Sequence, residues 1–219
     1  MNVKLLSNFT DFYDHHFDLD GEVFDRRDNI GMDRRQMFEF FGSLGLKTPF
    51  HGTLKEVFEH QAEWCPAPEL QHAVVYLDLN SHRGNDKIQV RGTDPYWQQF
   101  QDDFAAEFIP TYTQPNIGIS YRYLQIGPRK WWLEYISASD WRSNYGDVKI
   151  NILAEEAPGF HPKINYPLYV VDFLLAGGFY AIDFNQSPGL RGTGIENILK
   201  PQEVVDLIKE GIANAKESA

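Results

Sequence analysis

The pattern of apolar and polar residues first predicts a helix within residues 31–50, GMDRRQMFEFFGSLGLKTPF. Asp33 is placed to cap this helix, with Gln36 three residues later completing a capping box, and Gly45 marks its end. Four apolar residues recur at the spacing of one helical face: Met37, Phe40, Phe41 and Leu44.

Two further helices are predicted from the same kind of signal. A short helix is expected to begin at Thr53, because Glu56 completes a second capping box ahead of Val57 and Phe58. Residues 200–217, KPQEVVDLIKEGIANAKE, form an amphipathic pattern with a proline in the first turn. The predicted helices therefore lie in two places, between about residues 31 and 58 and at residues 200–217.

Strand patterns fill the space between these helices. AVVYLDL (73–79) and IQV (88–90) are separated by a polar loop, and residues 121–136 predict a hairpin that turns around Gly127 and Pro128. A third hairpin is predicted within residues 169–195, and the first thirty residues suggest a strand or two followed by a polar loop. The order of helices and strands indicates an α+β fold.

Composition narrows the class of protein. The 219 residues are 42% hydrophobic, enough for a substantial core, and the formal net charge of −11 with no basic run longer than a pair argues against bulk nucleic acid as a partner. Cys65 is the only cysteine, so an internal disulfide is excluded.

The N-terminus lacks an apolar targeting segment, and the seven histidines lack the paired spacing of a zinc site. We expect a soluble cytoplasmic protein without a membrane partner; the sequence does not indicate an oligomeric state.

The third hairpin carries acids in an apolar setting. If Gly177 and Gly178 form a two-residue turn, Asp172 lies opposite Asp183, and Asn185 shares their face. Like charges in that position destabilise a strand pair unless a cation lies between them, and two carboxylates with an amide oxygen are ligands suited to Mg²⁺. Alternatively, the turn lies elsewhere and the acids are solvated at a sheet edge, or the two carboxyl groups share one proton.

Several motifs point to one known family. DFNQSPGLRGTGI (183–195) and the segment 31–50 resemble two parts of the ATP-grasp superfamily of carboxylate-amine ligases: its magnesium-binding end, and its Met-Asp-Lys helix with a Gly-x-x-x-Pro strand entry. AVVYLDLNSHRGNDKIQV resembles the strand and loop that cover the triphosphate, AAEFIP (105–110) the nucleotide hinge, and DWRSNYG (140–146) the Arg-Ser-Asn segment of ribosomal-protein glutamate ligases. The resemblance covers about residues 31–215.

The resemblance implies a domain organisation. One ATP-grasp domain is expected over residues 1–219, with two α+β lobes that grip a nucleotide. Residues 1–30 would be a reduced N-terminal segment, about 31–110 the nucleotide-covering lobe and about 111–219 the metal-binding lobe, with the usual preceding domain reduced or absent.

The resemblance also assigns roles to residues. Arg34 stands where the family has its first nucleotide-binding lysine, and the second lysine is absent from AVVYLDL, as in an arginine-for-lysine clade of phages and bacteria that this chain resembles. The implied nucleotide-binding set is Arg34, Arg83, Lys87, Glu107, Phe108 and Ile109; the metal ligands are Asp172, Asp183 and Asn185; the catalytic residues are Arg142 and Asn144.

Some of these residues also allow a purely structural interpretation. Arg34 and Arg35 lie in a helical first turn, where the macrodipole favours a nearby anion, but neighbouring acids can pair with them on a solvated face. Arg142 can simply brace its loop, whereas a guanidinium beside phosphates would stabilise transferring charge. His82, beside Arg83, is a candidate phosphate contact.

The predicted function is an ATP- and Mg²⁺-dependent ligase that joins a small-molecule or peptide carboxylate to an amine through an acyl phosphate. The alternatives are a nucleotide-binding or kinase-like ATP-grasp protein without ligase activity, and a non-catalytic adaptor. The missing strand lysine is the feature that keeps the alternatives open.

Overall fold

The computed structural model describes residues 17–19, 22–24, 32–80, 86–111, 116–156, 162, 164, 166–186 and 188–217. The chain divides into two compact units. The smaller contains Met32–Thr113 and Leu174–Ile182, and the larger contains Met1–Gly31, Gln114–Phe173 and Asp183–Ala219.

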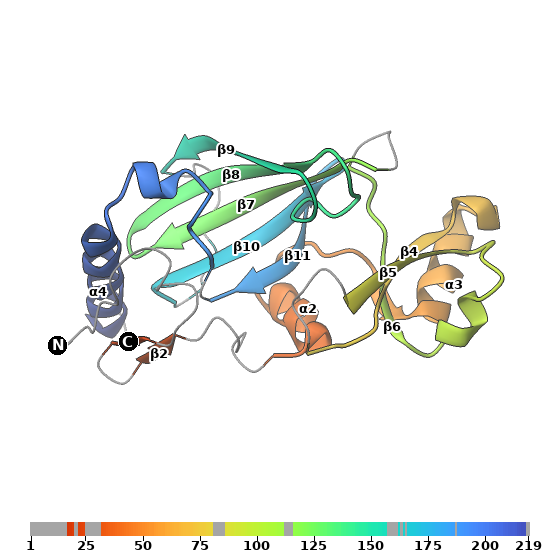
Figure 1. The fold of residues 1–219 in the computed structure, drawn as a ribbon. Helices are drawn as coiled ribbons and strands as arrows, with labels where there is room; N and C mark the ends of the chain where they lie inside the picture. Colours follow the sequence, from red (N-terminus) through yellow and green to blue (C-terminus); the bar gives the residue numbers. More distant parts are fainter. Residues whose placement is uncertain are drawn as a thin grey trace. The chain divides into compact units, whose positions relative to one another are not determined.

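The smaller unit consists of two α-helices and a four-stranded antiparallel sheet of order β3-β6-β4-β5 (Figure 1). Its elements are α2 (Arg34–Ser43), β3 (His51–Thr53), α3 (Leu54–Trp64), η1 (Pro68–Leu70), β4 (His72–Tyr76), β5 (Lys87–Arg91), η3 (Trp97–Phe100) and β6 (Phe104–Glu107).

Both predicted capping boxes are present in this unit. Asp33 caps α2 through the Gln36 backbone N–H at 2.9 Å, and Thr53 caps α3 with Glu56 in the reciprocal position. The apolar face of α2 differs by one position from the prediction, since Phe38 is buried and Phe40 is only partly buried. Phe38 lies on the inward face because its ring stacks on His51 at 4.7 Å and contacts the rings of the sheet. The sequence therefore predicted this helix correctly, but tertiary packing decided which of its residues face the core.

The larger unit is built on a five-stranded antiparallel sheet of order β11-β10-β7-β8-β9 (Figure 1). Its elements are β1 (Phe17–Leu19), β2 (Glu22–Phe24), β7 (Gly118–Ile126), β8 (Arg129–Ser137), β9 (Val148–Glu155), β10 (Leu168–Leu175), β11 (Phe179–Asn185), η4 (Ile195–Asn197) and α4 (Pro201–Glu217). The hairpin around Gly127 and Pro128 and the C-terminal helix are confirmed, whereas β9 was not predicted.

The two faces of this sheet have different partners. On one face, Leu133, Val170 and their neighbours pack against Val204 and Ile208 of α4 in the main core. The other face carries buried rings, among them Tyr123 and Tyr169, whose centroids lie 6.0 Å apart. The apolar side of α4 is therefore buried against the sheet. None of the helices in the described part of the chain is long and apolar enough to cross a bilayer.

The third hairpin joins β10 to β11 through a turn that is longer than predicted. The strands end at Leu175 and resume at Phe179, so three residues connect them instead of Gly177 and Gly178 alone. Gly177 takes a φ of 68°, and the Ala176 N–H donates to the Gly178 carbonyl at 3.0 Å. The positive φ is the conformation that glycine adopts without a steric cost.

Gly118, the first residue of β7, should be intolerant of a side chain. A Cβ there would lie 2.6 Å from the Ser143 nitrogen and 2.7 Å from the Arg142 carbonyl carbon, both backbone atoms of the turn above it. We expect Gly118→Ala to lower the free energy of unfolding by about 1–3 kcal/mol, measured by urea denaturation. Gly178→Ala is the control, because a Cβ there meets nothing within 4 Å and should change stability by less than about 0.5 kcal/mol. Equal effects at the two glycines would contradict the packing argument.

Candidate functional site

A buried ion pair occupies the face on which the acids of the third hairpin were predicted. Asp172 of β10 is the direct cross-strand neighbour of Arg122 in β7. The Nε and Nη2 atoms of Arg122 donate to the two carboxylate oxygens of Asp172 at 2.7 and 2.8 Å. Only 15% of the Arg122 side chain and 9% of the Asp172 side chain are exposed. This bidentate geometry is the strong form of an arginine–carboxylate contact.

Tyr135 of β8 holds the other side of the same guanidinium. The Nη1 atom of Arg122 donates to the Tyr135 hydroxyl at 3.1 Å, and the guanidinium carbon lies 4.5 Å from the centre of the tyrosine ring. Burial alone would lower the pKa of Arg122, but Asp172, Tyr135 and Asp183 outweigh it and raise that pKa above its ordinary value. Arg122 therefore stays a cation inside the sheet.

Asp183 and Asn185 lie on the same face as this ion pair. Phe184 stacks on Tyr169 at 5.9 Å, so it belongs to the opposite face of the sheet, and the residues on either side of it point the other way. Tyr169 and Asp172 are three residues apart in β10, so Asp172 also points away from Tyr169. Asp183 and Asn185 are half-buried, and Oδ1 of Asp183 accepts the Phe184 N–H at 3.1 Å.

The predicted use of this face as a metal site stays a prediction. The described residues contain no group of three or more His, Cys, Asp or Glu side chains able to hold a metal. The predicted ligand set has only two acids and an amide, Asp172, Asp183 and Asn185. The sequence analysis missed Arg122, which supplies a positive charge beside Asp172 and acts on Asp183 as well. The strand that carries Arg122 was predicted, but its pairing with β10 was not.

Arg142 lies in a turn that the chain braces internally. Its Nε and Nη2 atoms each donate to Asp140 at 2.8 Å, and its guanidinium carbon lies 3.9 Å from the centre of the Tyr145 ring. The Ser137 hydroxyl fixes the same turn by donating to the Tyr145 carbonyl at 2.6 Å. Asn144 is exposed. This geometry agrees with the bracing alternative, and the catalytic roles of Arg142 and Asn144 remain predictions.

In the smaller unit, Arg34 is buried, with 3% of its surface exposed. Its Nη1 atom lies 3.6 Å from the Met37 sulfur and its guanidinium carbon 5.4 Å from the centre of the Tyr76 ring. Lys87 is half-buried in β5 and pairs across the sheet with Tyr76. Arg34 and Lys87 thus share an aromatic neighbour, whereas Arg83 and His82 lie outside the described residues.

The predicted hinge, residues 105–110, spans the end of β6. The Glu107 N–H donates to the Phe50 carbonyl at 2.8 Å, and the Phe108 N–H donates to the His72 carbonyl at 2.9 Å. The Phe108 ring lies 4.2 Å from the His72 ring, and Ile109 is buried. Three residues chosen from one motif therefore occupy fixed positions at the end of the sheet.

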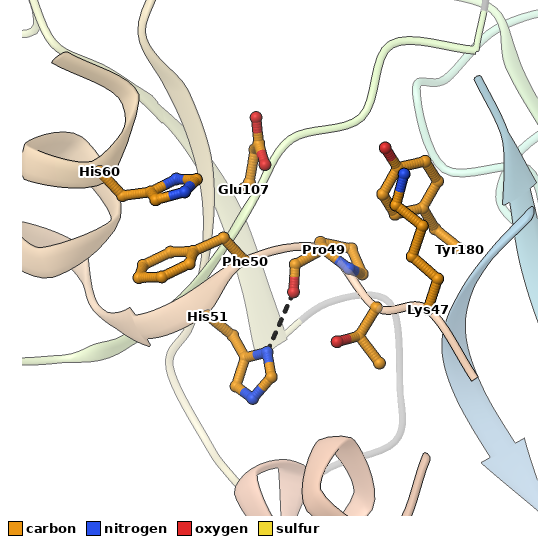
Figure 2. A pocket seen from close by; sticks show the side chains of 8 residues that line it. Lys47, Pro49, Phe50, His51, His60, Glu107 and Tyr180 are labelled. Atoms are coloured by element: carbon orange, nitrogen blue, oxygen red, sulfur yellow. Dashed lines mark hydrogen bonds between the residues drawn. The ribbon is translucent and has the colours of Figure 1, made fainter. Parts of the chain in front are cut away.

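Glu107 lines a cavity of about 470 Å³ within the smaller unit (Figure 2). One side is a stacked pair of rings, Phe50 and His60, whose centres lie 3.9 Å apart. At the other, the Lys47 ammonium lies 4.0 Å from the centre of the Tyr180 ring. The cavity combines a carboxylate, a cation and aromatic surfaces, so it suits a small polar ligand with a planar part.

Sequence reasoning found Glu107 but missed the rest of this cavity. Lys47 is followed in the chain by the residues that lead into β3, whereas Tyr180 comes from the distant third hairpin. The Ala181 N–H donates to the Lys47 carbonyl at 2.8 Å, which joins the two segments. A contact between segments so far apart leaves no local signal in the sequence.

Comparison with known proteins identifies the fold. No family model matches the chain, and no curated protein matches it significantly. Among solved structures, it is similar to two structures of D-alanine–D-alanine ligase from Bacillus anthracis, one of them complexed with ATP. Both are 12% identical to this chain and cover 89% of it. The ATP complex has a TM-score of 0.51, and 70% of its own chain is covered; the other structure has a TM-score of 0.54, and 71% of its own chain is covered.

A third similar structure is the ATP-grasp ligase PsnB complexed with a minimal precursor. It is 12% identical over 85% of this chain, with a TM-score of 0.53, and this chain spans 61% of its length. The predicted α+β, ATP-grasp fold is therefore confirmed. At this level of identity the similarity establishes the fold alone.

The stability of the smaller unit should depend on the protonation of His72. Burial, with a further contribution from Arg91, lowers the pKa of His72 to about 4, although Asp94 acts in the opposite direction. In the unfolded chain His72 takes up a proton near pH 6.5, whereas in the folded chain it does so only near pH 4. The free energy of unfolding therefore falls as the pH drops from about 6.5 to about 4. After allowance for the exposed part of the ring, we expect a loss on the order of 1 kcal/mol.

This loss can be measured by urea denaturation of the wild type and His72→Gln between pH 7 and pH 4.5. Glutamine does not titrate, so the variant should show a shallower decrease in the free energy of unfolding. An unchanged pH dependence in His72→Gln would assign the decrease to other groups.

The Arg122–Asp172 pair should contribute strongly to folding of the larger unit. Asp172→Ala leaves a buried guanidinium without its carboxylate, and we expect the free energy of unfolding to drop by about 3–5 kcal/mol. Glu155→Ala is the matched control, because Glu155 pairs with Arg129 at 3.3 Å on the same sheet but half of its side chain is exposed. That change should cost less than about 1 kcal/mol by chemical denaturation. Similar costs for the two variants would show that burial of the pair does not matter.

Proposed function

We propose that this protein is an ATP-dependent ligase that joins a carboxylate to an amine through an acyl phosphate. The observation that carries the proposal is the combination of the ATP-grasp fold with two acids, an amide and a buried arginine on one face of the larger unit's sheet. The similar structures include ligases, one of them complexed with ATP, which supports the same class of reaction.

The nucleotide would bind to the smaller unit. Glu107 ends β6, Phe108 and Ile109 follow it, and Glu107 lines the cavity, which supports the hinge role assigned from the sequence motif. Arg34 and Lys87, with Arg83 outside the described residues, would hold phosphates. Arginine and lysine supply the positive charge that phosphoryl groups require, and arginine also offers a planar fork of donors.

The residues of the larger unit fit magnesium by their chemistry. Asp172, Asp183 and Asn185 present hard oxygen donors on one face, and Mg²⁺ in proteins needs only one or two carboxylates besides water and phosphate. The Arg122 fork uses one lone pair on each Asp172 oxygen, and each oxygen has a second. Bound magnesium would neutralise charge on the transferring phosphoryl group.

The chain's own groups would then serve to bind and orient the reactants. The substrate carboxylate attacks the γ-phosphorus of ATP, ADP leaves, and the amine displaces phosphate from the acyl phosphate; no side-chain nucleophile is needed. Arg142 would stabilise the developing oxyanion once its guanidinium turns from Asp140 toward the substrate, and Asn144, two residues later, would contribute an exposed amide. The substrates would be a small-molecule or peptide carboxylate and an amine.

Nucleotide binding tests the proposal directly. Calorimetry with ATP and Mg²⁺ should give a binding isotherm for the wild type, and Asp183→Ala combined with Asn185→Ala should weaken binding at least about tenfold, because two oxygen donors are lost. Glu155→Ala, an exposed change on the same sheet, should bind like the wild type. Absence of nucleotide binding in the wild type would refute the proposal.

The reaction itself can be followed by ADP release in the presence of mixed carboxylic acids and amines. A ligase should release ADP only when both are present. ADP release or phosphorylation that is independent of the amine would instead indicate a kinase-like protein, the alternative that the absence of a lysine from β4 keeps open.

A further inference from the structure

The guanidinium of Arg122 already occupies the oxygens that a metal at the acid face would use. Both carboxylate oxygens of Asp172 accept from Arg122, at 2.7 and 2.8 Å, and little of either side chain is exposed. Asp172 therefore has a cation beside it before any metal binds.

Three features hold this cation in place. Arg122 and Asp172 are cross-strand neighbours, so the β7–β10 register fixes their separation. The Tyr135 hydroxyl accepts from the third guanidinium nitrogen at 3.1 Å, and the tyrosine ring covers the guanidinium. Asp183 adds a second negative charge close enough to act on Arg122. Arg122 thus sets a positive charge against both acids of this face.

We propose that Arg122 and a divalent cation compete for Asp172, so that Arg122 preserves the geometry of the acid face while weakening its affinity for free metal. This inference rests on the proposed function, because it concerns the same predicted metal site. The competition follows from charge, since a guanidinium bound to a carboxylate repels a second cation at that carboxylate and already holds one lone pair on each of its oxygens. Asp183 and Asn185 lie on the same face and would share the incoming ion.

The competition has a functional consequence. A planar guanidinium fork matches phosphate oxygens as well as carboxylate oxygens. A metal that arrives with a triphosphate therefore brings an alternative partner for Arg122, whereas a metal that arrives alone does not. Arg122 would thereby favour binding of the metal together with the nucleotide over binding of the metal alone.

The test is binding of Mn²⁺ without nucleotide, measured by calorimetry and by electron paramagnetic resonance. Arg122→Met removes the charge and keeps much of the side-chain volume, and we expect it to bind Mn²⁺ at least about tenfold more tightly than the wild type. Arg122→Lys keeps the charge but loses the fork, so we expect a smaller gain of about threefold. Unchanged or weaker Mn²⁺ binding in both variants would overturn the competition.

Two controls give the result its meaning. Arg129→Met removes a more exposed arginine from the same sheet and should leave Mn²⁺ binding unchanged; an equal gain there would reduce the effect to net charge and overturn the proposal. Adding Asp172→Asn to Arg122→Met should abolish the gain, and a gain that persists would place the ion elsewhere and also overturn it. If Arg122→Met fails to fold, as judged by circular dichroism, Arg122→Lys decides the question.

The outcome is separable from that of the proposed function. Nucleotide binding by the wild type tests the ligase proposal, whereas Mn²⁺ binding without nucleotide tests the competition for Asp172. A protein that binds ATP but shows no gain in Mn²⁺ affinity in the Arg122 variants would retain the first proposal and lose the second.

Discussion

The larger unit depends on one interaction, the buried bidentate ion pair between Arg122 and Asp172. It joins β7 to β10 at the centre of a five-stranded sheet, continuous with the face that packs against α4. Removing either partner would leave a charge with little access to water, which is far more costly than losing an exposed pair. The pair also places a cation close to both Asp172 and Asp183 on one face of the sheet.

The smaller unit depends on hydrogen bonds and packing that fix where β6 ends. The side-chain amide of buried Gln61 bonds both backbone groups of His72, each at 2.9 Å, and His72 in turn accepts the Phe108 N–H. These bonds satisfy polar groups that would otherwise be buried without partners. The residues that follow β6 are thus presented on a rigid support, as expected of groups that bind a ligand.

The candidate site was only partly predictable. Alternation along a strand was enough to place Asp183 and Asn185 on a common face, and the hinge motif identified Glu107, which lines the cavity. Arg122 carried no motif, and its partner is 50 residues away in the sequence. The fork between Arg142 and Asp140 spans only two residues, so that contact was within reach of local reasoning, but its strength depends on the braced turn around it.

The sequence by itself determined the local structures of this protein. The capping boxes at Asp33 and Thr53, the hairpin at Gly127 and the periodicity of the helices follow from contacts between residues three or four positions apart or from backbone preferences. The tertiary structure alone decided which face of α2 is buried, that β10 pairs with β7, and that Lys47 meets Tyr180. These outcomes depend on long-range packing and strand register, for which one sequence contains no local signal.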